Sequence, residues 1–346
     1  MTTVDPAVEE ALDTVPLPET SRRRLLTGAG LTSAAAAATA LLAACSKNNS
    51  SSGGKGDFPS TPKWRFVFVN HVTTNPFFVP TRYGIADACA LLGCSYQWTG
   101  SEKSVNGEMV SAFNTAVSAK ADGIGLSVVS TTAFSDPVDR ALDAGIPVVS
   151  YNADGAVGNP GTNRLGYVGQ DLFTSGQQLG KRIVSLVDSG DVVGFIATPG
   201  SLNIQPRIDG AKQAIQSSGK PIRFEQITSG AEVPQELSTI DAYVQGHPNL
   251  KGIFAVDAGS TQGVAQTVAK YKLKSKGVAA GGFDLVPETL NGIKSGSLDF
   301  TIDQQPYLQG FLPVMYLYLY KLSGGLQQPP DTNTGLLFVT KDTVGS

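Results

Sequence analysis

Residues 65–99 hold the pattern that decides the fold of this chain. They open with the apolar run Arg65-Phe66-Val67-Phe68-Val69 and close with the shorter run Cys94-Ser95-Tyr96-Gln97-Trp98-Thr99. Between these runs, one face of a helix is indicated by apolar residues at offsets of zero, three, four and seven, namely Ile85, Ala88, Cys89 and Leu92. A strand, a helix and a second strand in this order predict a βαβ unit with parallel strands.

The same alternation continues along the chain. The next helix is indicated by Met109, Val110, Phe113 and Val117, and further strands are predicted at residues 123–129, 147–151, 191–196, 222–227, 252–256 and 278–283. Buried strands that alternate with helices predict parallel sheets covered by helices on both faces. Because the pattern forms two series, the sequence predicts an α/β protein with two doubly wound lobes.

A late helix is expected to return to the first lobe. It follows the strand-like segment 300–306, and its apolar stripe consists of Leu308, Phe311, Leu312, Met315 and Leu319. We therefore expect a first lobe of residues 64–170 plus 305–334 and a second lobe of residues 171–304 plus 335–346.

The N-terminal segment has the features of an export signal. Three arginines at positions 22–24 precede an apolar stretch, residues 25–44, that ends in Leu42-Ala43-Ala44-Cys45. The arginines resemble a twin-arginine signal, and the ending resembles a bacterial lipobox. The alternative, a membrane span, is weakened by the glycines and hydroxyl residues that interrupt the stretch. We expect residues 1–44 to be removed, Cys45 to carry lipid, and residues 45–63 to tether the body to the outer face of the cytoplasmic membrane.

Composition excludes several classes of function. Cleavage before Cys45 would leave 302 residues with 23 basic and 24 acidic side chains, so the chain lacks the positive charge that binds nucleic acid. A metal site is not expected, because the two histidines, His71 and His247, lie far apart and no metal-binding spacing of residues occurs. The sequence also contains no cofactor-binding motif. Cys89 and Cys94 are compatible with either a disulfide or two buried thiols.

Six motifs, in the same order along the chain, resemble those of the periplasmic sugar-binding proteins of the ribose-binding family, which are the solute receptors of ABC importers. They are Asn75-Pro76-Phe77-Phe78, residues 147–152, Pro206-Arg207-Ile208-Asp209-Gly210, residues 254–257, Gly282-Phe283-Asp284 and residues 301–306. Each lies where a strand ends or a helix begins, which is where open α/β sheets bind ligands. The resemblance implies a type I periplasmic-binding-protein fold, with a hinge of three crossovers near Gln170, Gln304 and Gly335 that closes around the ligand.

The candidate site combines aromatic planes with polar groups suited to sugar hydroxyls. The candidate ligand-binding residues are Asn75, Phe77, Phe78, Asn152, Asp154, Arg207, Glu232, Asp257, Asp284 and Gln304. Each has a structural alternative: the phenylalanines suit a core, and Asp284 suits a helix cap. His71 is expected to be a hydrogen-bonded structural residue.

Departures from the family concern the ligand. This chain has Asn152-Ala153 at the position where ribose-binding relatives have an Asp-Arg pair. It has Asp257 where those relatives have Asn. A cleft with three aspartates facing Arg207 would disfavour sugar acids and permit neutral sugars, sugar alcohols or an amino sugar. The missing arginine makes an acyclic polyol an attractive hypothesis.

We expect a monomeric binding protein, not an enzyme, that delivers its ligand to an ABC permease and its ATPase. The chain lacks nucleophile-elbow and phosphate-loop motifs. A lactose-repressor-type regulator would carry an N-terminal helix-turn-helix in place of the lipid signal. A sensory receptor that presents a sugar or a furanosyl signalling molecule to a membrane partner stays open as the alternative.

Overall fold

The computed structural model describes residues 62–155 and 161–345. A compact unit spans Thr61–Ser346. The predicted signal, the lipid-attachment residue Cys45 and all but the last two residues of the tether lie outside the described residues. Within the described part, no helix is both long and apolar enough to cross a membrane.

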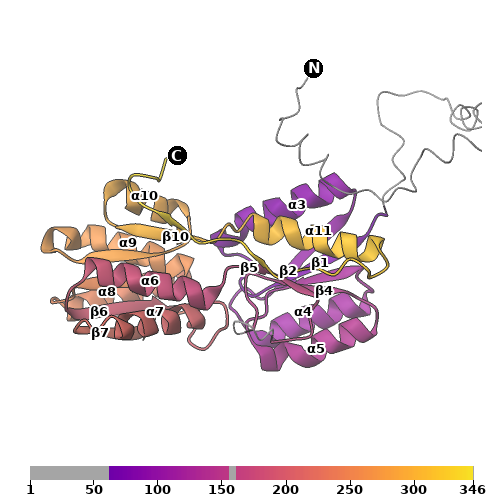
Figure 1. Ribbon diagram of the computed structural model, residues 1–346, viewed down its shortest axis with the longest axis horizontal. Coiled ribbons are helices and arrows are strands. Elements are labelled where there is room, and N and C mark those ends of the chain that lie inside the picture. The colour runs from indigo at the N-terminus through magenta and orange to yellow at the C-terminus, as the bar shows by residue number, and fades with distance from the viewer. Residues whose placement is uncertain (1–61, 156–160, 346) are drawn as a thin grey trace, which may run out of the picture. The chain divides into compact units, whose positions relative to one another are not determined.

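The first lobe is built on a six-stranded parallel sheet with strand order β11-β5-β4-β3-β1-β2. Its strands are β1 (Arg65–Asn70), β2 (Ser95–Gly100), β3 (Gly123–Leu126), β4 (Val148–Tyr151), β5 (Gly166–Gly169) and β11 (Thr332–Asn333). Its helices are the 3-10 turn η1 (Pro76–Phe78), α3 (Val79–Leu92), α4 (Asn106–Ser118), α5 (Thr131–Asp143) and α11 (Leu308–Leu322). The predicted return of the last long helix is thus present: α11 lies beside α3 (Figure 1).

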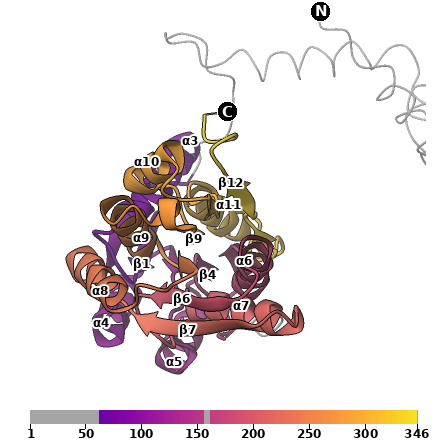
Figure 2. The ribbon, with the colours of Figure 1, turned by 90° about the vertical axis from the view of Figure 1, so that its left-hand side faces the viewer.

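The second lobe repeats this plan with strand order β12-β10-β9-β8-β6-β7. Its strands are β6 (Gly190–Ile196), β7 (Ile222–Thr228), β8 (Gly252–Ala255), β9 (Ala279–Phe283), β10 (Phe300–Asp303) and β12 (Leu337–Val339), the last antiparallel to β10. Its helices are α6 (Leu172–Leu186), α7 (Gln205–Ser217), α8 (Val233–Gly246), α9 (Ala258–Lys270), η2 (Leu273–Lys276) and α10 (Pro287–Ser295). Figure 2 shows α6 and α7 on one side of the sheet and α8 and α9 on the other.

Strand alternation divides each core into two clusters. In β1, Val67 and Val69 pack with α4 and α5, whereas Phe66 and Phe68 face α3 and α11. Successive side chains of a strand point to opposite faces of a sheet, so a run that is apolar throughout needs helices on both faces. The second sheet has the same division, with one cluster under α6 and α7 and the other under α8, α9 and α10.

Three segments connect the lobes, between β5 and α6, between β10 and α11, and between β11 and β12. Gln170, in the first of them, joins all three: its Nε2 donates to the backbone oxygens of Asp303 at 3.3 Å and Gly335 at 3.0 Å. The prediction of two doubly wound lobes joined by three crossovers is confirmed, while the residue at which each lobe begins and ends stays a prediction.

The two remaining cysteines are free thiols in this structure. Gly93 ends α3 with a left-handed φ of 70°, which brings Cys94 back so that its backbone N–H donates to the oxygen of Cys89 at 3.0 Å. A hydrogen bond between the two thiols, together with burial, raises the pKa of Cys89. Of the two arrangements left open by the sequence, the structure has free thiols, with Cys89 buried and Cys94 half-buried.

Candidate ligand-binding site

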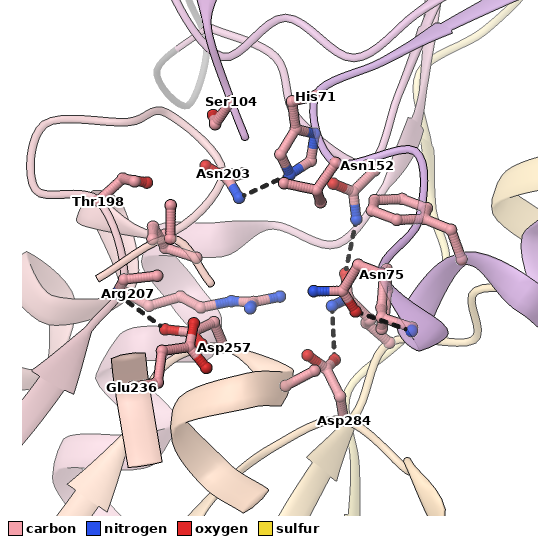
Figure 3. Close-up of a pocket in the computed structure, with 18 residues that line it drawn as sticks. His71, Asn75, Ser104, Asn152, Thr198, Asn203, Arg207, Glu236, Asp257 and Asp284 are labelled. Carbon is pink, nitrogen blue, oxygen red and sulfur yellow. Dashed lines mark hydrogen bonds between the residues drawn. The ribbon is translucent and has the colours of Figure 1, made fainter. Parts of the chain in front are cut away.

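A pocket lies where strands of both sheets end. It contains about 560 Å³ not filled by protein atoms, part of it open to solvent, which suits a small molecule. Of the ten predicted binding residues, eight line it: Asn75, Phe77, Phe78, Asn152, Arg207, Asp257, Asp284 and Gln304 (Figure 3). The structure therefore brings together residues up to 229 positions apart in the sequence.

The aromatic side of the pocket comes from the turn after β1. Phe77 and Phe78 pack edge to face with ring centroids 4.7 Å apart, and they are 8% and 2% exposed. Asn75 shapes this turn, because its Oδ1 accepts a hydrogen bond from the Phe77 backbone at 2.9 Å. Its amide nitrogen is left to point into the pocket (Figure 3). The phenylalanines are thus both core residues and pocket wall.

A buried polar network forms the hinge side. Gln304 Nε2 donates to Asp284 Oδ1 at 2.7 Å, and Asn152 Nδ2 donates to Gln309 Oε1 at 3.0 Å. Asn152 directly follows β4 and Asp284 directly follows β9, and both have left-handed backbones with φ of 61° and 75°. Asn and Asp tolerate this conformation better than most side chains, and here it turns them at the strand ends. Asp284 is not the cap of α10, since Val286 holds that position.

Arg207 is the buried cation of the site. It is 2% exposed, and its two terminal nitrogens donate to the Val256 oxygen at 2.8 Å and to Gln170 Oε1 at 3.0 Å. The guanidinium lies 4.1 Å from the centre of the Phe283 ring. Its Nε atom is buried and has no hydrogen-bond partner among the described residues. A planar donor group fixed in this way is suited to orient a hydroxylated ligand.

The pocket carboxyl groups are poorly solvated. Burial raises the pKa of Asp284 to about 7, although Arg207 and the hydrogen bond from Gln304 act in the opposite direction. Burial also raises the pKa of Asp257, whose two oxygens accept from the backbone N–H groups of Ser260 at 2.9 Å and Ala197 at 3.1 Å. Asp257 is therefore the N-cap of α9 as well as a pocket residue.

Two predicted residues lie elsewhere. Asp154 is buried in an ion pair, and its Oδ2 accepts from Arg164 at 2.6 Å and 3.0 Å. Glu232 has 55% of its side chain exposed and pairs with Lys103 at 3.0 Å. Neither acid lines the pocket in this structure, and each has a basic partner, so a role for them in ligand binding stays a prediction.

Three contacts join the two lobes on the side of the pocket away from the hinge. The His71 Nε2 atom lies 3.1 Å from Asn203 Nδ2, and the Leu202 backbone N–H donates to the Val129 oxygen at 3.1 Å. The third contact is the ion pair between Lys103 and Glu232. His71 also bonds to Ser127 through Nδ1 at 2.9 Å, and burial lowers its pKa to about 3, so it is neutral. These contacts join residues of the two lobes beside the pocket.

Sequence reasoning missed Glu236, which lines the pocket from the first turn of α8. A glutamate near a helix N-terminus is common because it interacts well with the helix dipole, so the sequence offers no signal that separates it from an ordinary helix residue. Among the described residues, no group of three or more metal-binding side chains occurs.

Comparison with known proteins identifies the family. A family model described as the periplasmic binding protein domain matches residues 66–325, three quarters of the chain. The chain belongs to the periplasmic binding protein family. The predicted resemblance to sugar-binding members of the ribose type is confirmed by relatives named for ribose, allose and pentoses.

Three members of the family are instructive. The Xylose/arabinose-binding protein XylF of Sulfolobus acidocaldarius is 51% identical over 300 residues, which cover 84% of this binding protein and 74% of the relative. A solute-binding protein from Burkholderia graminis, solved with D-arabinose, has a TM-score of 0.76 at 27% identity and covers 84% of this chain and 99% of its own. A carbohydrate transporter from Acidothermus cellulolyticus, solved with myo-inositol, has a TM-score of 0.72 at 26% identity. The match covers 82% of this chain and 96% of the transporter chain.

Proposed function

We propose that this protein is the extracytoplasmic substrate-binding component of an ABC importer and that it captures a small neutral sugar, in the first place an aldopentose. The observation that carries the proposal is the buried network of Arg207, Asp284 and Gln304 opposite the aromatic wall of Phe77 and Phe78. Aromatic planes cover the apolar faces of a sugar, and fixed polar groups bind its hydroxyls.

The names of the relatives support a pentose. The relative with 51% identity is named for xylose and arabinose, and the Burkholderia protein was solved with D-arabinose. The myo-inositol complex keeps cyclic polyols among the candidates, beside the acyclic polyols that the missing arginine favours.

The proposal includes no chemistry on the ligand. Both oxygens of Asp257 are engaged by backbone N–H groups, and Asp284 is bound to Gln304, which suits binding better than proton transfer. Closure of the two lobes would hold the sugar, and the closed form would dock on the permease. We further propose that a lipid on Cys45 anchors the protein as a monomer at the membrane.

A ligand screen by thermal unfolding and isothermal titration calorimetry tests the proposal. The panel contains D- and L-arabinose, D-xylose, D-ribose, xylitol, myo-inositol, glucosamine and glucuronic acid. At about 1,000 times its Kd, a ligand stabilises by about 4 kcal/mol, which corresponds to roughly 8–16 °C in the melting temperature. We expect such a shift with at least one pentose and none with glucuronic acid.

Arg207→Lys should abolish most of this shift, because the single nitrogen of lysine cannot replace the two guanidinium nitrogens that bond separately to Val256 and Gln170. Arg223→Lys is the matched control, since Arg223 is exposed and pairs only with Asp191 among the described residues. A flat response of the wild type to the whole panel would refute the sugar-binding proposal. Permease and ATPase genes beside this gene would support import over the sensory alternative.

A further inference from the structure

Glu236 is a buried acid for which the fold itself supplies no partner. It lies in the first turn of α8, is 3% exposed and lines the ligand pocket. Its Oε2 atom is buried and makes no hydrogen bond with any residue in the described part of the chain. Buried polar groups in folded proteins are nearly always hydrogen-bonded, so an orphan in a pocket points to a missing partner.

The neighbouring helix leaves room for this side chain. A Cβ atom placed on Gly259 would lie 1.8 Å from Glu236 Oε2, so any larger residue there would displace the carboxyl group. Gly259 follows directly after Ala258, the first residue of α9, and α9 is capped by Asp257. The position of Glu236 against α9 is therefore built into the packing of the second lobe.

The charges around Glu236 disfavour its ionised form. Its pKa is raised to about 9 by burial first and by the negative charge of Asp257 second. The other titratable side chains that line the pocket are His71, which is neutral, Arg207 and Asp284. No hydrogen bond joins Asp257 to Glu236 Oε2, and the two Asp257 oxygens each accept from a backbone N–H group. Figure 3 shows the Glu236 and Asp257 side chains next to each other below Arg207.

We propose that Glu236 is a ligand-binding residue that determines specificity: its carboxyl group stays protonated and donates a hydrogen bond to a hydroxyl oxygen of a neutral sugar. This inference rests on the proposed sugar-binding function. The buried Nε of Arg207 is a second orphan in the same pocket, so one hydroxylated ligand would satisfy both. A ligand without an oxygen at this position would leave both groups unpaired and is selected against.

Two substitutions separate the hydrogen bond from simple packing. Glu236→Met keeps the volume and removes the polar atoms, so the ligand-free protein should melt at the wild-type temperature or above while ligand affinity falls about tenfold or more. Glu236→Gln keeps a donor and should bind within about threefold of the wild type. Glu288→Gln, at an exposed position of α10 in the same lobe, is the matched control.

Calorimetry shows which form of the acid binds. Titrations at pH 7.5 in phosphate and in Tris give the number of protons exchanged on binding, and we expect the same number for the wild type and Glu236→Gln. Release of close to one additional proton by the wild type would mean that the carboxylate binds, and would overturn the proposal.

The remaining outcomes are equally decisive. Wild-type affinity in Glu236→Met, or equally weak binding in both variants, would overturn the role of Glu236 as a donor. The wild type could also prefer glucosamine over neutral sugars and lose this preference in Glu236→Gln. That result would identify Glu236 as a site for a cation and would overturn its role as a donor as well. Each of these results requires a wild type that binds a ligand, whereas a wild type that binds nothing on the panel refutes the proposed function instead.

Discussion

The ionisation of single residues controls the stability of the ligand-free protein at alkaline pH. A raised pKa means that the folded state keeps a proton that the unfolded state has lost, so stability falls as pH rises toward the folded value. For Glu236 the pH range over which stability falls extends from about 4.5 to about 9, and for Asp284 it extends from 3.8 to about 7. His71 acts in the opposite direction, because its pKa is lowered from 6.5 to about 3 and its stabilisation is lost as pH falls.

The window from pH 7 to pH 9 lies between the pKa of Asp284 and the pKa of Glu236. We expect the free energy of unfolding of the ligand-free wild type to decrease there by up to about 1.4 kcal/mol per pH unit. Urea denaturation at pH 7, 8 and 9 measures this slope. In Glu236→Gln the slope should be smaller than in the wild type, whereas Glu288→Gln should behave like the wild type; equal slopes in all three proteins would contradict the prediction.

The predictability of the site differs from residue to residue for a physical reason. Asn152, Asp257 and Asp284 could be placed because each lies within two residues of the end of a buried strand, β4, β8 and β9 respectively. Open α/β sheets bind ligands at the carboxyl ends of their strands. That Asp154 and Glu232 lie outside the pocket lining could not be predicted, because their partners, Arg164 and Lys103, are set by tertiary structure.

The pocket residue Glu236 was missed for a related reason. Its burial depends on Gly259 in another helix, and no local pattern reveals that contact. Local sequence thus identifies the edge at which a ligand binds, while the pairing of charges at that edge is decided by the packing of helices.

At the scale of elements, the contact between α6 and α7 positions Arg207. A Cβ atom on Gly176 of α6 would lie 2.2 Å from the backbone oxygen of Arg207 and 2.6 Å from its Cα. On the facing helix, a Cβ atom on Gly210 would lie 2.3 Å from the Phe173 oxygen. Glycines at these positions let the two backbones approach closely, and the approach sets where the arginine enters the pocket.

Gly176→Ala should consequently damage both stability and binding. We expect a loss of about 1–3 kcal/mol in the free energy of unfolding, as in overpacked cores, together with weaker ligand binding because Arg207 is displaced. Gly107→Ala in α4 is the control: its Cβ would meet nothing within 4 Å, so helix propensity should leave it neutral or stabilised by about 0.5–1 kcal/mol. Denaturation and calorimetry on both variants check this, and wild-type affinity in Gly176→Ala would contradict it.

The order of the elements could be predicted more fully than the site. Runs such as residues 252–256 and 278–283 are apolar throughout, which requires helices on both faces and a parallel sheet. The antiparallel strand β12 was not predicted, because a strand of three residues with one buried side chain has almost no periodicity to detect.

For the whole molecule, the contacts across the mouth of the pocket predict how closure is stabilised. The ion pair between Lys103 and Glu232 is more than half exposed on both sides, at 61% and 55%, and such pairs contribute little to stability. Glu232→Gln should therefore weaken ligand binding by less than about fivefold. The effect should shrink further in 1 M salt, where exposed charges are screened.

Titration calorimetry at low and high salt tests this prediction. A loss of about a hundredfold, independent of salt, would indicate that Glu232 contacts the ligand directly. Lys103→Gln removes the same ion pair from the other lobe, so the two variants should have similar affinities.

The covering of β1 by α11 has a consequence for synthesis of the chain. Phe66 and Phe68 pack under Val314 and Leu317, which are made about 250 residues later. At about 5–20 residues per second, the ribosome needs roughly 12–50 s to cover that distance. For this interval the newly made first lobe lacks the helix that covers Phe66 and Phe68. We expect the nascent protein to need protection by a chaperone until its last long helix emerges.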